Sequence, residues 1–158
     1  MSVLSVFYWC ENTALGEAIR DSRWLFPAIE SLHLLGLAVI GGAVLVVNLR
    51  LLGFGLRRQP SAQLWRDAHP WLLGSLAIMI ATGLLLFTSE ATKLYYHEAF
   101  WVKMISLALS IVFTFTAVRR AALADPARAR PFWNRIVALV SLVLWSGVGI
   151  GGRWIGFS

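Results

Sequence analysis

A carboxylate and an imidazole stand inside the first long apolar segment of the chain. Glu30 and His33 are spaced i, i+3, so a helix places them on one face. Ionisable side chains at membrane depth are unfavourable and usually face a protein interior or a ligand. A neutral imidazole can ligate haem iron or copper, and a nearby carboxylate can orient its second nitrogen. The pair predicts a cofactor site; the alternative is a structural hydrogen bond between these two residues and another helix.

Lys103, His97 and Trp145 are further candidates for this site. Lys103 stands about one turn inside the third apolar segment, as either a surface anchor or an inward-facing partner of Glu30 or of a metal. His97, in the preceding loop, is a candidate second imidazole ligand beside His33. Trp145, in the middle of the last apolar segment, either lines a cofactor pocket or fills the core. A polar stripe on the same helix favours an inward Lys103: Ser106, Ser110 and Thr114.

The composition indicates a membrane protein. The chain has 158 residues, 58% of them hydrophobic, and a mean hydropathy of +0.70, which favours a single polytopic domain. The net charge of +6 lies in short loops between apolar segments, so topology explains it and no nucleic-acid partner is expected. Cys10 is the single cysteine, which excludes a disulfide within the chain. Phosphate-binding glycine loops, zinc spacings and nucleophile elbows are absent from the sequence, which argues against hydrolases and nucleotide-driven pumps.

Four apolar segments predict an all-α, four-helix bundle in a lipid bilayer. A helix rising ~1.5 Å per residue needs roughly 20 residues to cross a hydrocarbon core of ~30 Å. The expected spans are about 25–52, 71–89, 100–119 and 132–154. Pro70 is expected at or near the first position of the second helix. The spacing Gly147-x-x-x-Gly151 predicts a close approach of two helix backbones.

Residues 1–23 are too polar to span the bilayer. Apolar residues such as Val6 and Ile19, interspersed with acids, predict an interfacial amphipathic helix over this segment. The segment lacks a basic start and a continuous apolar run, so a cleaved signal peptide is not expected. Asp21 or Ser22 is expected to cap the first span.

The distribution of charge predicts the orientation of the spans. Nine arginines lie in or beside two loops, the one between spans one and two and the one between spans three and four. On the opposite side we count five cations, which five acids offset. By the positive-inside rule both termini lie outside, in the periplasm of a bacterial inner membrane. This places the candidate residues in the outer leaflet and His69 near the cytoplasmic face.

Several short motifs carry a resemblance to known membrane proteins. They are Glu30-x-x-His33-Leu-Leu-Gly36, Asn48-Leu-Arg50-Leu-Leu-Gly53, Thr82-Gly83, Phe100-Trp101-Val-Lys103 and Gly152-Arg153-Trp154. Over about residues 24–154 the chain resembles an uncharacterised family of small bacterial four-span proteins. More distantly it is similar to the copper-resistance-D-type membrane domain and to the membrane-bound, haem-containing protoporphyrinogen oxidase. In that oxidase an early-span histidine and a lysine opening the third span are functionally important, which His33 and Lys103 match in order.

These observations together predict a b-type haem-binding inner-membrane protein, serving electron transfer or a haem-linked redox reaction. His33 is the expected axial ligand, Glu30 its orienting partner, and Lys103 a distal ligand or a propionate contact. One alternative is a copper-handling or small-solute permease that uses the same polar cluster. Another is a cofactor-free structural subunit that packs through Gly147 and Gly151 against a larger membrane complex. The expected partners are the lipid bilayer and either a second copy of the chain or such a complex.

Overall fold

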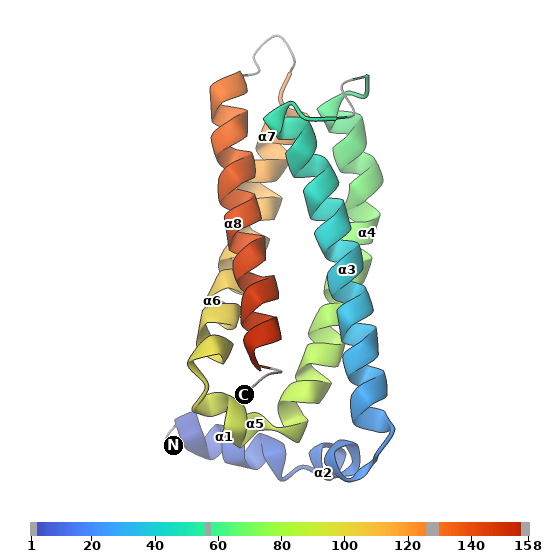
Figure 1. Ribbon diagram of the computed structural model, residues 1–158, viewed down its shortest axis with the longest axis vertical. Helices are drawn as coiled ribbons and strands as arrows, with labels where there is room; N and C mark the ends of the chain where they lie inside the picture. Colours follow the sequence, from blue (N-terminus) through green and yellow to red (C-terminus); the bar gives the residue numbers. More distant parts are fainter. Residues whose placement is uncertain (1–2, 56–57, 126–129, 156–158) are drawn as a thin grey trace.

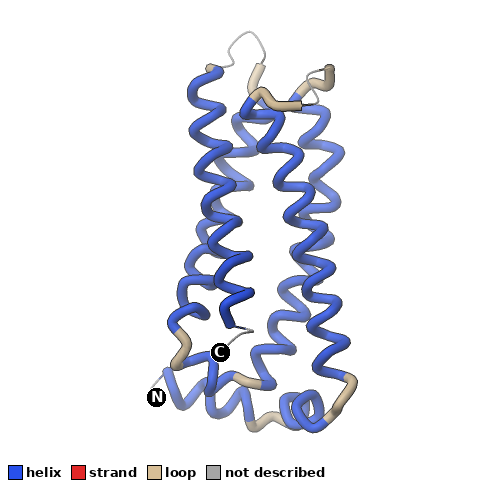
Figure 2. Tube along the Cα trace, viewed as in Figure 1, coloured by secondary structure: helices blue, strands red, loops and turns tan. Residues whose placement is uncertain are grey.

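Four long helices form the body of the protein (Figure 1). The computed structural model describes residues 3–55, 58–125 and 130–155, and over these residues it is helical and contains no strand (Figure 2). The long helices are α3 (Leu25–Leu52), α4 (Ser61–Ser89), the stretch Glu98–Leu123 and α8 (Pro131–Ile155). Each is long and apolar enough to cross a membrane. The predicted all-α, four-span architecture is confirmed.

The helices pack as two neighbouring pairs, α3 with α4 and α6 (Glu98–Phe113) with α8, and α3 also contacts α8. The apolar core lies where these helices meet. Its fully buried large side chains are Ile40, Leu72, Val118, Val137 and Val148. Asn48 is also buried, and its amide donates to Ser141 Oγ at 3.0 Å, which links α3 to α8. The outward faces carry many exposed apolar side chains, which a lipid bilayer solvates.

The second long helix begins ten residues earlier than the sequence predicts. Pro70, expected at its first position, lies inside α4. The upstream residues stay helical because their apolar side chains are buried: Leu64, Trp65 and Ala68. Ser61 Oγ also donates to the Ala122 carbonyl at 2.9 Å, which fixes the start of α4 against α7 (Arg119–Leu123). Burial of this face outweighs the hydrogen bond that proline removes.

The third long helix is not uniform. After α6, the segment Thr114–Val118 forms a π-helical turn, η1, which leads into α7. Trp145 of α8 donates its indole N–H to Thr114 Oγ1 at 3.0 Å within this turn. A π turn inserts an extra residue into the helix and rotates the faces that follow it.

Residues 1–23, expected as one amphipathic helix, contain two helices, α1 (Val3–Glu11) and α2 (Ala14–Asp21). The break occurs because the Thr13 hydroxyl accepts the Gly16 N–H at 3.2 Å and starts a new helix. Ser22, one of the two expected caps, accepts the backbone N–H of Leu25 at the start of α3.

Both short helices and α5 (Ala91–Tyr95) lie across one end of the bundle (Figure 1). Phe7 fastens α1 there through edge contacts with aromatic side chains, its ring centroid 5.0 Å from that of Phe87 and 5.2 Å from that of Tyr95. Glu11 Oε2 accepts the Thr92 N–H at 2.6 Å, which joins the end of α1 to α5. This end of the bundle is therefore covered by the N-terminal segment.

Candidate functional site

His33 lies in the first third of α3, near the covered end of the bundle, and its ring packs against α4. Its Nδ1 is 2.8 Å from Thr82 Oγ1. Next to Thr82, a Cβ added at Gly83 would lie 3.4 Å from His33 Cε1. A hydroxyl and an adjacent glycine therefore form the surface against which the half-buried imidazole packs.

The hydrogen bonds of Thr82 assign the tautomer of His33. The Thr82 hydroxyl has one proton, which it donates to the Ile78 carbonyl at 2.6 Å. Towards His33 the same oxygen must therefore accept, so Nδ1 carries the ring proton. Nε2 is left with a lone pair, the form in which an imidazole binds a metal.

Glu30 does not take the orienting role that its spacing from His33 predicts. It is exposed on α3, and within the described part of the chain it has no hydrogen bond or ion pair. Residues three apart on a helix point in directions about 60° apart around the helix axis. When the His33 ring turns towards α4, Glu30 therefore points to the side of the α3–α4 contact and not into it. Thr82 is the partner of Nδ1 instead.

Lys103 faces α8. A Cβ at Gly151 would lie 3.1 Å from Lys103 Cβ, and a Cβ at Gly152 would lie 3.5 Å from Lys103 Nζ. The aliphatic stem thus runs along a surface of two glycines and is half-buried. Among the described residues, no hydrogen bond or ion pair joins Lys103 to His33, whose ring packs on α4. The structure therefore places the imidazole of the first span and the amine of the third near the same end of the bundle, but on different helix pairs.

The glycine spacing on α8 has the predicted effect on helix packing. A Cβ at Gly147 would lie 2.9 Å from Ser106 Oγ, so α6 and α8 approach closely along the side that carries Ser106 and Lys103. Because α6 of the same chain occupies Gly147 and Gly151, these two glycines are not the contact with a larger complex that one alternative assigned to them.

Trp145 and His97 have structural surroundings of their own. Trp145 is buried in the core and its indole N–H is bound by Thr114. His97 precedes α6 as its N-cap residue, where its carbonyl accepts the Phe100 N–H at 3.0 Å. Among the described residues, no three His, Cys, Asp or Glu side chains gather as they would around a metal ion held by the protein alone.

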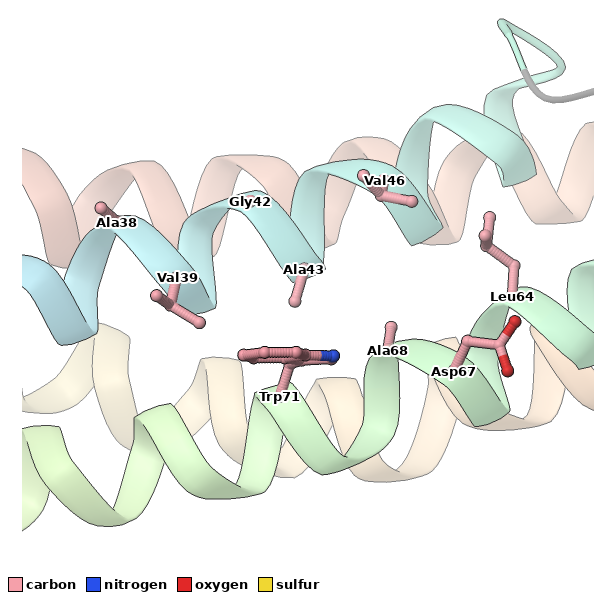
Figure 3. A pocket seen from close by; sticks show the side chains of 9 residues that line it. All are labelled: Ala38, Val39, Gly42, Ala43, Val46, Leu64, Asp67, Ala68 and Trp71. Atoms are coloured by element: carbon pink, nitrogen blue, oxygen red, sulfur yellow. The ribbon is translucent and has the colours of Figure 1, made fainter.

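A groove of about 370 Å³ lies elsewhere, between α3 and α4 (Figure 3). Trp71 forms its floor, and Asp67 is the one charged residue of its lining, at the end near Leu64. Neither His33 nor Lys103 belongs to this lining. The groove is an apolar indentation on the outside of the α3–α4 pair and has no part in the His33 site.

The four long apolar helices make this chain a multi-pass membrane protein, with a half-buried histidine on α3 and a half-buried lysine on α6. It belongs to the family described as a family of unknown function, DUF6644, whose model matches residues 6–158. No curated protein and no solved structure matches the chain significantly. The resemblance to a four-span family thus stands, whereas these comparisons return neither the copper-resistance-D-type domain nor the protoporphyrinogen oxidase.

Proposed function

We propose that this protein binds haem b at its covered end, with His33 Nε2 as an axial ligand. The observation that carries the proposal is the 2.8 Å distance between His33 Nδ1 and Thr82 Oγ1, whose own proton points to the Ile78 carbonyl, so that we assign the ring N–H as the donor. Histidines that ligate metals almost always donate their other N–H to an oxygen acceptor, which fixes the ring and its tautomer.

The surrounding residues fit this group in their chemistry. Gly83 behind the imidazole leaves no side chain against the ring. Lys103 offers an amine that would either bind the iron or pair with a haem propionate. Its stem is already aligned along Gly151 and Gly152, so little side-chain entropy is lost when it binds.

Haem at this position supplies one-electron exchange, which supports a role in electron transfer or a haem-linked redox reaction. The protein residues hold and orient the group: His33 donates a lone pair, Thr82 fixes its direction, and Lys103 supplies positive charge. By the distribution of arginines, the site lies in the periplasmic leaflet of a bacterial inner membrane with both termini outside. Glu30 and His97 are kept in the proposal as residues of the same leaflet, without an assigned contact.

The test is the visible spectrum of the protein purified in detergent after expression with added haem. A Soret band, and an α band that sharpens on reduction with dithionite, are expected for wild type. His33→Ala should lose both bands. The control is His69→Ala, which should keep both bands. His69 packs against Trp65 and Phe115, and it precedes Thr82, the partner of His33, by about 20 Å along α4 at ~1.5 Å per residue.

Two results would contradict the haem assignment. One is equal haem content in the His33 and His69 variants, and the other is a wild-type spectrum that contains only the 280 nm protein band. In the second case metal analysis separates the alternatives: stoichiometric copper supports the copper-handling role, and a colourless protein that co-purifies with larger partners supports the structural-subunit role.

A further inference from the structure

A second groove, of about 450 Å³, lies at the opposite end of the bundle from His33. It is formed by the π-helical turn and α7, and its lining combines apolar and cationic side chains. The lining residues are Phe115, Thr116, Arg119, Arg120, Leu123 and Ala124. Its size falls in the range of small-molecule sites, roughly 300–1,000 Å³.

The depth of the two arginines matches that of lipid headgroups. Arg119 follows Glu98, the first residue of α6, by about 31 Å at ~1.5 Å per residue. This distance equals the thickness of a bilayer hydrocarbon core, ~30 Å. The guanidinium groups of Arg119 and Arg120 therefore emerge at the headgroup level, while Phe115, one turn earlier, lies at the depth of the acyl chains and packs against Trp65 and His69.

The charge at this end favours an anion. Arg119 and Arg120 are exposed, and neither forms an ion pair with any residue in the described ranges. The sequence places nine arginines at this end of the bundle and two acids, Asp67 and Asp125. A guanidinium presents parallel N–H donors that match two oxygens of a phosphate, which a single ammonium does not.

We propose that this groove binds the headgroup phosphate of an anionic phospholipid. The two guanidinium groups hold the phosphate, and the acyl chains lie along the exposed apolar strip of α6 that leads to the groove. That strip consists of Ile105, Leu109 and Val112. The π-helical turn between the strip and the arginines sets the direction in which Arg119 and Arg120 leave the helix. The site is independent of the proposed haem site.

The experiment is native mass spectrometry of the full-length protein, delipidated in detergent and then incubated with phosphatidylglycerol or with phosphatidylcholine. Wild type should retain one phosphatidylglycerol and no comparable amount of phosphatidylcholine. Each arginine near a headgroup contributes ~1 kcal/mol, so the double variant Arg119→Gln/Arg120→Gln should bind phosphatidylglycerol about 30-fold more weakly. Both side chains are exposed, so this variant should fold, which circular dichroism checks.

The matched control is Arg135→Gln, which removes an exposed arginine of α8 at the same end but outside the groove. It should retain as much phosphatidylglycerol as wild type. An equal loss in the Arg135 variant, or equal retention in the double variant, would overturn the site. Displacement of the bound lipid by inorganic phosphate alone would overturn the choice of a phospholipid as the ligand.

Discussion

Replacing Thr82 with valine tests the arrangement of the His33 site most directly. Valine has nearly the same shape, so the change removes the hydroxyl without leaving a cavity. The hydrogen bond that it removes joins His33 Nδ1 to a side chain with only 4% of its surface exposed. The ring N–H then loses its close acceptor, and the imidazole loses the contact that fixes its rotation and tautomer.

The size of the effect follows from the burial of this hydrogen bond. Leaving a buried polar group without its partner costs about 1–3 kcal/mol. If that penalty falls on the haem-bound state, affinity drops by about fivefold to 150-fold. Mutations of residues that orient metal ligands weaken metal binding by a similar factor, ~10–100-fold. Thr82→Ser keeps the oxygen and should bind haem within a few-fold of wild type.

The assay is titration of haem into the haem-free protein in detergent, followed by the growth of the Soret band. Circular dichroism establishes that each variant is folded. The expected order of affinity is wild type, then Thr82→Ser, then Thr82→Val, with His33→Ala the weakest. If the valine variant bound haem as tightly as wild type while the His33 variant did not bind, the proposed orientation through Nδ1 would be refuted.

The N-terminal helices offer two further tests, both measured as thermal unfolding midpoints in detergent. Gly16→Ala should lower the midpoint through an overpacking penalty of about 1–3 kcal/mol, because its Cβ would overlap the backbone at the end of α4 and lie 2.9 Å from the Glu11 carbonyl oxygen. Gly74→Ala, whose Cβ would meet nothing within 4 Å, is the control, and an equal decrease there would contradict the packing argument. Hydrogen bonds from the Thr92 hydroxyl and backbone N–H lower the pKa of Glu11, so its stabilising effect is present above the pKa of the unfolded state and is lost as the pH falls through the lower pKa of the folded state. The midpoint should therefore drop on acidification in wild type and less so in Glu11→Gln; the same drop in both would disprove this role.

The sequence predicts the long helices well wherever hydrophobicity alone decides. The bounds of α3 agree with the expected span because an uninterrupted apolar run ends at Gly53, whose φ of 88° stops the helix in a left-handed conformation. The start of α4 is predicted wrongly because charged residues and Pro70 interrupt the apolar pattern upstream of residue 71. The buried side of this segment, which carries Trp65, is therefore not recognisable from the sequence. Whether such a segment continues as a helix depends on what it packs against, and the local sequence does not contain that information.

The same limit applies to the site. His33 and Lys103 are recognisable from sequence because an ionisable group in an apolar segment needs a partner. Thr82 gives no such signal, since a threonine in a membrane helix can satisfy its hydroxyl on its own backbone, as this one does with Ile78. Its second role becomes visible only when the rotation of α3 against α4 is known. Glu30 was expected as the partner because its spacing places it on the same helix face as His33. The spacing does not fix the direction in which the His33 ring turns, and the ring turns to Thr82.

The pairing of helices also determines the order in which the residues of the proposed site come together. His33 and Thr82 both belong to the first two spans, which pack against each other, whereas Lys103 packs on Gly151 and Gly152 in the last two. During synthesis the imidazole can therefore be oriented while the second half of the chain is still on the ribosome. The amine arrives only with the second helical hairpin, so the proposed site can bind its ligand through both side chains only after the two halves have docked.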